Sequence, residues 1–152
     1  MTDGTPGGTA LFDLSGHVAA VIGGTGVLGG ALCHGFGAAG AAVAVLGRSR
    51  ERADARVAAL RAEGVAAAAV LADAGDRSAL EDARRQVEGA LGPVDILVNA
   101  AGVNSATPFF EIGLAEWHAI LDTNLTSAFL ACQVFGHAMV ERGRGGSIIN
   151  IS

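Results

Sequence analysis

A glycine-rich segment near the amino terminus most constrains how this chain folds. Residues 23–30 read Gly-Gly-Thr-Gly-Val-Leu-Gly-Gly and contain the pattern G-x-G-x-x-G. The preceding residues, 17–23, form a continuous apolar run. After the glycines, Leu28, Leu32 and Phe36 recur at steps of four, which is typical of one face of a helix. Glycines permit a tight turn here. The segment therefore predicts a strand that leads directly into a helix.

Strand and helix patterns alternate through the rest of the sequence. We expect strands at 17–23, 42–46, 66–71, 94–99 and 147–152, and helices at 26–39, 49–63, from Asp76 or Ser78 to 91, and at 114–142. Ser78 and Glu81 have the spacing of a capping box. This alternation requires parallel strands with right-handed crossovers. The predicted fold is α/β, a Rossmann-type doubly wound parallel sheet of strand order 3-2-1-4-5 that stops after the fifth strand.

Length and composition indicate one domain and exclude some classes of partner. With 152 residues, 51% of them hydrophobic, the chain can bury one core, and we assign it to residues 13–152. Residues 1–12 are expected to form a flexible tail. A formal net charge of −5 argues against nucleic acid. Neither a signal peptide nor a long apolar run occurs, so we expect no membrane contact and a cytoplasmic location.

The glycine segment also has the chemistry of a dinucleotide site. Its backbone can approach a pyrophosphate without hindrance from a Cβ, and amide N–H groups at the helix start point toward the phosphates. A merely structural glycine turn is the alternative. The residues predicted to bind the cofactor here are Gly23, Thr25, Gly26, Val27, Leu28 and Gly29.

The end of the second predicted strand indicates which dinucleotide is bound. An acid there would pair with the adenosine ribose diol and favour NAD. The chain instead has Gly47, Arg48 and Ser49, which leave room for a 2′-phosphate and supply a guanidinium donor. We therefore predict NADP as the cofactor, with NAD as the alternative. The competing interpretation is that Arg48 and Arg50 form a solvated first helical turn.

Asp73, Asn99-Ala100-Ala101-Gly102 and Asn124 follow the glycine segment in this order, and over residues 11–152 the series of motifs resembles the short-chain dehydrogenase/reductase family. The resemblance implies that Asp73, with Ala74 beside it, binds the adenine amino group. It implies that Asn99-Ala100-Ala101-Gly102 braces the sheet beside the cofactor, and that Asn124 is the catalytic asparagine. Ile22 and Ala100 depart from the usual threonine and asparagine. The local amino-acid sequence also resembles that of members labelled D-mannonate oxidoreductase or fructuronate reductase.

Each of these residues also has a plainer interpretation. Asp73 could cap a helix, and Asn99 could simply end a strand. Asparagine in mid-helix, as at Asn124, lowers helix propensity and favours a kink or a held water. The four histidines lack metal spacing, so no metal site is predicted. Cys33 and Cys132 are interpreted as small buried residues.

The family resemblance implies hydride transfer between a nicotinamide and a small carbonyl or alcohol. In the family a tyrosine transfers the proton and a lysine four residues later tunes it, whereas this sequence contains neither residue type. The family's active serine would follow Ser152. We therefore expect this chain to be the cofactor-binding, amino-terminal part of a longer reductase. We expect the chain to be inert by itself. The complete protein is expected to form a homo-oligomer through residues 114–142. The alternative is a non-catalytic nucleotide-binding module or sensor.

Overall fold

The computed structural model describes residues 12–151, so most of the expected tail and Ser152 lie outside the described residues. Its centre is a five-stranded parallel sheet of order β3-β2-β1-β4-β5, which confirms the predicted fold and strand order. The strands are β1 (Val18–Ile22), β2 (Ala42–Gly47), β3 (Ala67–Leu71), β4 (Ile96–Asn99) and β5 (Ser147–Asn150). The α-helices are α1 (Val27–Ala38), α2 (Arg50–Ala62), α3 (Arg77–Leu91), α4 (Leu114–Leu121) and α5 (Ser127–Arg142).

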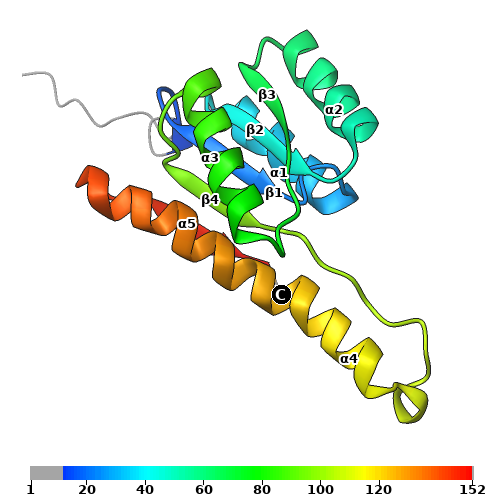
Figure 1. Ribbon diagram of the computed structural model, residues 1–152. Coiled ribbons are helices and arrows are strands. Elements are labelled where there is room, and N and C mark those ends of the chain that lie inside the picture. Colours follow the sequence, from blue (N-terminus) through cyan, green and yellow to red (C-terminus); the bar gives the residue numbers. More distant parts are fainter. Residues whose placement is uncertain (1–11, 152) are drawn as a thin grey trace, which may run out of the picture.

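Helices cover the sheet on both faces (Figure 1). One layer of the core joins Ala20 of β1 to Leu80 of α3 and Phe135 of α5. The other joins Val21 of β1 to residues of α1 and α2, including Cys33. Neighbouring residues of β1 therefore point to opposite faces, and both kinds are fully buried. This burial explains why the central strands are continuously apolar in sequence.

Of the two predicted starts of helix α3, Asp76 and Ser78, the structure uses Asp76 as the N-cap. Asp76 Oδ1 accepts hydrogen bonds from the backbone N–H of Ser78 at 2.8 Å and from that of Ala79 at 3.4 Å. The Ser78 hydroxyl also donates to Asp76 Oδ1, at 2.8 Å. Ser78 is thus a donor within the first turn, and the predicted capping box with Glu81 is wrong. These hydrogen bonds lower the pKa of Asp76, and the bond from the Ser78 hydroxyl has the largest effect.

The helix expected over residues 114–142 is interrupted by one π-helical turn, Asp122–Thr126. The N–H of Ser127 bonds back five residues to the carbonyl of Asp122. Hydroxyl groups compete for the carbonyls on either side: Thr123 Oγ1 donates to Ala119 O at 2.9 Å, and Ser127 Oγ to Thr123 O at 2.6 Å. Such local bonds favour a widened turn over regular helix. The expected bounds of the helical segment, 114 and 142, are therefore confirmed, while its α-helical geometry is interrupted at 122–126.

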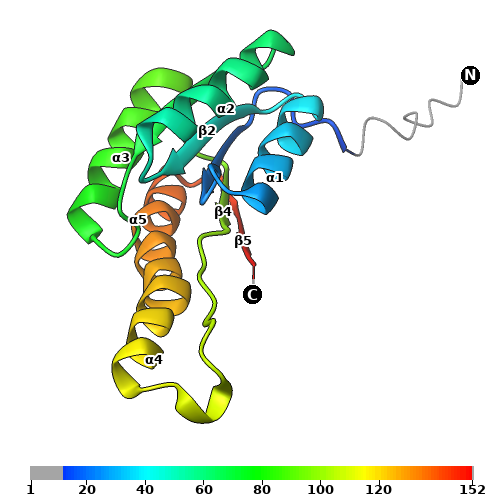
Figure 2. The same ribbon diagram turned by 90° about the vertical axis from the view of Figure 1, so that its right-hand side faces the viewer.

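The two ends of this helical pair differ in their surroundings. Helix α5 packs beside α3 and the sheet, whereas α4 extends beyond it, after a loop that contains a short 3₁₀ turn, Phe109–Glu111 (Figure 2). Strand β5 lies at the edge of the sheet, and all four of its residues are exposed. In the part of the chain that the structure describes, no helix combines the length and apolarity needed to cross a membrane.

Candidate functional site

A cavity of about 460 Å³ opens at the carboxyl ends of the strands, beside the point where the strand order reverses. In doubly wound sheets this is the place where ligands bind. The walls come from the segments that follow β1, β2, β3 and β4, and from the π turn. Its lining residues are Ile22, Gly23, Thr25, Gly26, Gly47, Arg48, Arg52, Ala72, Asp73, Ala74, Gly75, Ala100, Ala101, Gly102, Val103, Asp122, Thr123 and Ser127.

The glycine loop brings three backbone segments into close contact. Gly23 has φ +82°, and a Cβ there would stand 2.7 Å from the Ala100 carbonyl group. A Cβ on Gly29 would overlap the carbonyl group of Gly23. Helix α1 begins after Gly26 without a side-chain cap and without an acid in its first turn. The N–H groups of that turn are therefore available to an anion.

The predicted glycine-loop residues are thus divided between two tasks. Gly23, Thr25 and Gly26 line the cavity, whereas Gly29 is buried and lets α1 approach the loop. Val27 and Leu28 do not line it; their side chains are 92% and 54% exposed, respectively. Any contribution of these two residues to the cavity would come from the backbone.

Of the two cofactor-binding residues predicted after the end of β2, Arg48 and Ser49, only Arg48 lines the cavity. Arg48 lines it, but Ser49 caps α2, with Oγ accepting from the N–H of Arg52 at 3.4 Å. Arg50 forms an ion pair with Asp54 at 3.8 Å. Arg52, which our sequence analysis did not single out, lines the cavity. The sequence carries no local signal for it, because Arg48 precedes α2 and helical spacing does not relate the two arginines.

The segment after β3 places a carboxylate in the cavity wall. Asp73 Oδ1 accepts a 2.9 Å bond from the N–H of Gly75, and Ala74 lies beside it in the lining. Helix α3 takes Asp76 as its cap, so the alternative interpretation of Asp73 as a helix cap is wrong. A second carboxylate, that of Asp122, lines the cavity from the π turn and accepts from Thr126 Oγ1 at 3.2 Å.

The segment after β4 has a buried anchor and an exposed wall. Asn99 is 5% exposed, and its Nδ2 donates to Asn150 Oδ1 at 2.8 Å, which links β4 to β5. It does not line the cavity. Ala100, Ala101 and Gly102 do, and the N–H of Ala100 bonds to Ile22 O at 2.9 Å.

Asn124 lies at the centre of the π turn and binds the loop that follows β4. Its Oδ1 accepts from the N–H of Val103 at 2.7 Å, and its Nδ2 donates to the carbonyl of Val103 at 2.9 Å. Both halves of the amide are therefore engaged by the backbone of one residue. Asn124 itself does not line the cavity, but Val103 does.

Most lining residues that we missed lie next to predicted ones or in the π turn. Ile22 ends β1, so the rule that ligands meet strand ends could have found it, whereas Gly47 was already interpreted as leaving room for a phosphate. A Cβ on Gly47 would stand 2.8 Å from the Thr25 side chain, which explains the glycine. Thr123 and Ser127 reach the cavity because of the π turn, for which the sequence carries no comparable signal.

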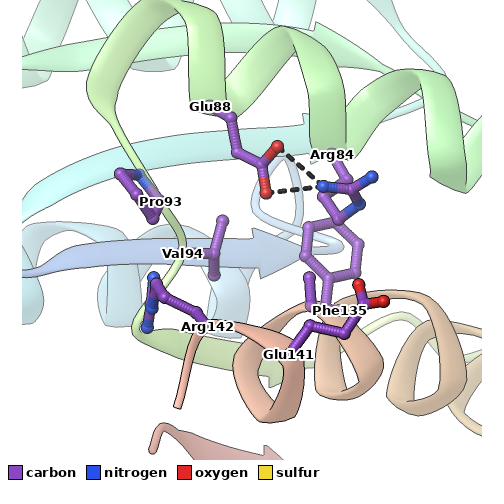
Figure 3. A pocket seen from close by; sticks show the side chains of 8 residues that line it. Arg84, Glu88, Pro93, Val94, Phe135, Glu141 and Arg142 are labelled. Carbon is purple, nitrogen blue, oxygen red and sulfur yellow. Dashed lines mark hydrogen bonds and ion pairs between the residues drawn. The ribbon is translucent and has the colours of Figure 1, made fainter. Parts of the chain in front are cut away.

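A second cavity, of about 290 Å³, lies between α3 and α5, near Pro93 and Val94 before β4 (Figure 3). Each of its two arginines is paired with a carboxylate. Arg84 Nη1 lies 2.7 Å from both carboxylate oxygens of Glu88. Arg142 Nη2, on the opposite wall, donates to Asp95 Oδ1 at 2.8 Å. By contrast, no carboxylate within the described chain pairs with Arg48 or Arg52, so the larger cavity is the better candidate for an anionic ligand.

Comparison with known proteins decides the family. The pattern of the family described as short chain dehydrogenase matches residues 17–152. The chain belongs to the short-chain dehydrogenase family. The gluconate 5-dehydrogenase of Gluconobacter oxydans (strain 621H) is 36% identical over 141 residues, which cover 93% of this chain and 55% of that protein. The 5-keto-D-gluconate 5-reductase of Escherichia coli (strain K12) is 34% identical over 141 residues, with the same two coverages.

Solved dehydrogenases of the family have the same architecture. The gluconate 5-dehydrogenase of Burkholderia cenocepacia J2315, in complex with NADP and tartrate, superposes with a TM-score of 0.84 at 33% identity. The match covers 91% of this chain and 55% of that one. The chain thus spans about half the length of the relatives it matches. These relatives are named for gluconate chemistry, not specifically for mannonate or fructuronate.

Proposed function

We propose that this chain forms the cofactor-binding part of an NADP-dependent dehydrogenase that interconverts the alcohol and ketone forms of a sugar acid. The single observation that carries the proposal is the cavity at the strand switch point, which the glycine loop and unpaired arginines border. The gluconate 5-dehydrogenase structure with NADP and tartrate supports both the cofactor and the class of substrate.

The residues of the cavity fit a dinucleotide in three respects. Gly23, Gly29 and Gly47 let neighbouring segments approach closely, and two of them, Gly23 and Gly47, border the cavity without a side chain. The uncapped start of α1 offers N–H groups and a positive helix end to the pyrophosphate. Arg48 offers a bidentate donor to a ribose phosphate, while Asp73 offers an acceptor to the adenine amino group.

When bound, NADP accepts or supplies the hydride. This chain's residues then serve to bind and orient it. Asn124 is proposed to act as a positioning residue, because its two bonds to Val103 hold the loop that forms one wall. Ala100 holds the start of the same loop through the bond of its N–H to Ile22 O. A wall that is fixed in advance costs less entropy when the cofactor binds.

Proton transfer needs a group that this chain does not provide in the family's usual form. The 152 residues include no tyrosine, and all ten cationic Lys/Arg positions are arginine. When a hydride adds to a carbonyl carbon, the carbonyl oxygen needs a proton donor. We therefore propose that the chain by itself binds NADP without turning it over, and that the whole enzyme, a homo-oligomer, completes the reaction.

Equilibrium titration and an activity assay test this proposal. We expect the purified chain to bind NADPH, seen as a change in nicotinamide fluorescence, and to give no reduction of 5-ketogluconate. The full-length protein should oxidise gluconate with NADP⁺. Failure of the chain to bind either NADPH or NADH would contradict the cofactor site. Turnover by the chain alone would contradict the proposal that it binds NADP without catalysing the reaction.

A further inference from the structure

Three arginines follow one another at steps of four at the end of β2 and along α2: Arg48, Arg52 and Arg56. The first two line the large cavity. The guanidinium of Arg56 lies over Gly30 of α1, where even a single added methyl group would overlap it. Arg52 and Arg56 thus lie on the side of α2 that faces the cavity and α1, and Arg48 precedes the helix.

These arginines have no carboxylate partner among residues 12–151, unlike their neighbour on the helix. Arg50 lies two residues from Arg52 and pairs with Asp54 at 3.8 Å. No ion pair is formed by Arg48, Arg52 or Arg56 in the described chain. Like charges four residues apart on a helix repel each other and destabilise it. This repulsion applies to Arg52 and Arg56, since Arg48 precedes α2, and an anion bound beside Arg52 would offset it.

The two carboxylates that line the cavity form no ion pair with Arg48 or Arg52. Asp73 lines the cavity from the segment after β3, and its Oδ1 already accepts from the N–H of Gly75. Asp122 lies in the π turn and is bonded to Thr126. Glu51, in the first turn of α2, does not line the cavity. Two guanidinium groups therefore dominate the part of the cavity beside Gly47.

We propose that Arg52 is a second specificity-determining residue, which binds the 2′-phosphate of NADP together with Arg48. The assignment rests on the proposed cofactor site. The end of β2 is where the adenosine ribose is recognised in such folds, whereas the pyrophosphate meets the start of α1. A guanidinium on either side of a dianionic phosphate gives charge-assisted bonds that NAD cannot form. Ser49 keeps Arg52 in the first turn of α2 by accepting its N–H.

Arg52→Ala tests the assignment, with Arg50→Ala as the matched control on the same turn. NADPH and NADH are titrated separately against the wild-type chain and each variant. We expect Arg52→Ala to weaken NADPH binding about tenfold or more and to leave NADH unchanged, since one charge-assisted contact is lost. Arg52→Lys should recover part of the loss. Arg50→Ala should bind both dinucleotides as the wild type does.

Two results would overturn the assignment. One is NADPH affinity in Arg52→Ala within twofold of the wild type, and the other is an equal loss for NADPH and NADH. Failure of the underlying proposal is distinguishable, because the wild-type chain would then bind neither dinucleotide. The side chain of Arg52 is exposed and makes no hydrogen bond in the described structure, so circular dichroism should show an unchanged fold.

Discussion

Asn99 and Asn150 stand opposite each other where β4 and β5 pair, and their side-chain amides bond at 2.8 Å. Asn99 is buried, and its Oδ1 has no partner among the described atoms. Asn150 is exposed. The bond to Asn150 is therefore the main hydrogen bond of the buried Asn99 side chain. It also links the edge strand to the strand that precedes Ala100.

Removal of Asn150 should destabilise the chain by leaving the Asn99 amide without its side-chain oxygen partner. We expect Asn150→Ala to lower the free energy of unfolding by about 1–3 kcal/mol, the usual cost of an unpaired buried polar group. Urea titration of the two single variants and of the double variant with Asn99→Ala measures the coupling. Strictly additive losses would show that the bond contributes nothing.

The close approach of α1 to the glycine loop predicts a sharp contrast between two glycines of the same helix. Gly29→Ala places a Cβ against the Gly23 carbonyl group, whereas Gly35→Ala meets nothing within 4 Å. We expect Gly29→Ala to weaken NADPH binding about tenfold or more, a loss of about 1.4 kcal/mol. Gly35→Ala should retain the affinity and add about 0.5–1 kcal/mol of stability. Equal affinities of the two variants for NADPH would show that the glycine loop is not part of the cofactor site.

The two cysteines should react very differently with thiol reagents. Cys33 is fully buried beneath the glycine loop, and burial raises the pKa of its thiol to about 11. Cys132 is only half-buried, so the expectation that both are buried was wrong for this residue. Because the thiolate is the reactive form, the native chain should label once at mildly alkaline pH, at Cys132. Cys132→Ala should abolish native labelling; rapid labelling of that variant would contradict the packing of Cys33.

The cap of α3 predicts a pH-dependent difference in stability. The Ser78 hydroxyl and the N–H groups of Ser78 and Ala79 lower the pKa of Asp76 in the folded chain. A carboxylate whose folded pKa is depressed stabilises the fold above its unfolded pKa, and the contribution is lost as pH falls through the folded value. The stability gap between wild type and Asp76→Ala should therefore narrow below about pH 4.

Asn at this position is the matched control, since its side chain also caps helices but does not titrate. The free energy of unfolding of Asp76→Asn, followed by urea titration from neutral to acidic pH, should differ from that of Asp76→Ala by a constant amount. A gap between wild type and Asp76→Ala that stays constant in acid would show that the carboxylate of Asp76 is not the cap.

The fold was predictable because its signals are local and repeat along the chain. Apolar strands such as 42–46 and helix ends such as Gly40 fixed the alternation, and parallel pairing with right-handed crossovers then gave the strand order. Asn124 indicated an irregularity in the helix, but its form as a π turn was not predictable, since it depends on hydroxyl bonds around the turn and on the contact of Asn124 with Val103, twenty-one residues away.

The site was predictable where it follows from strand ends, as for Gly23, Arg48 and Asp73. It was less predictable where a side chain has a structural task. Ser49 caps α2 and Asn99 joins two strands, so neither lines the cavity. Arg52 was missed because a helix of mixed charge gives no sign of which arginine lacks a partner. Only the pairing of Arg50 with Asp54 makes that distinction.

Backbone NMR spectra of the chain, recorded during titration with NADPH, test the central claim most directly. The account predicts that the largest amide shifts fall on Gly23, Gly26, Arg48, Asp73 and Gly102, which line the cavity at the strand switch point. Val94 and Phe135, at the cavity between α3 and α5, should be unaffected. Shifts centred on that second cavity, or no shifts at saturating NADPH, would contradict it.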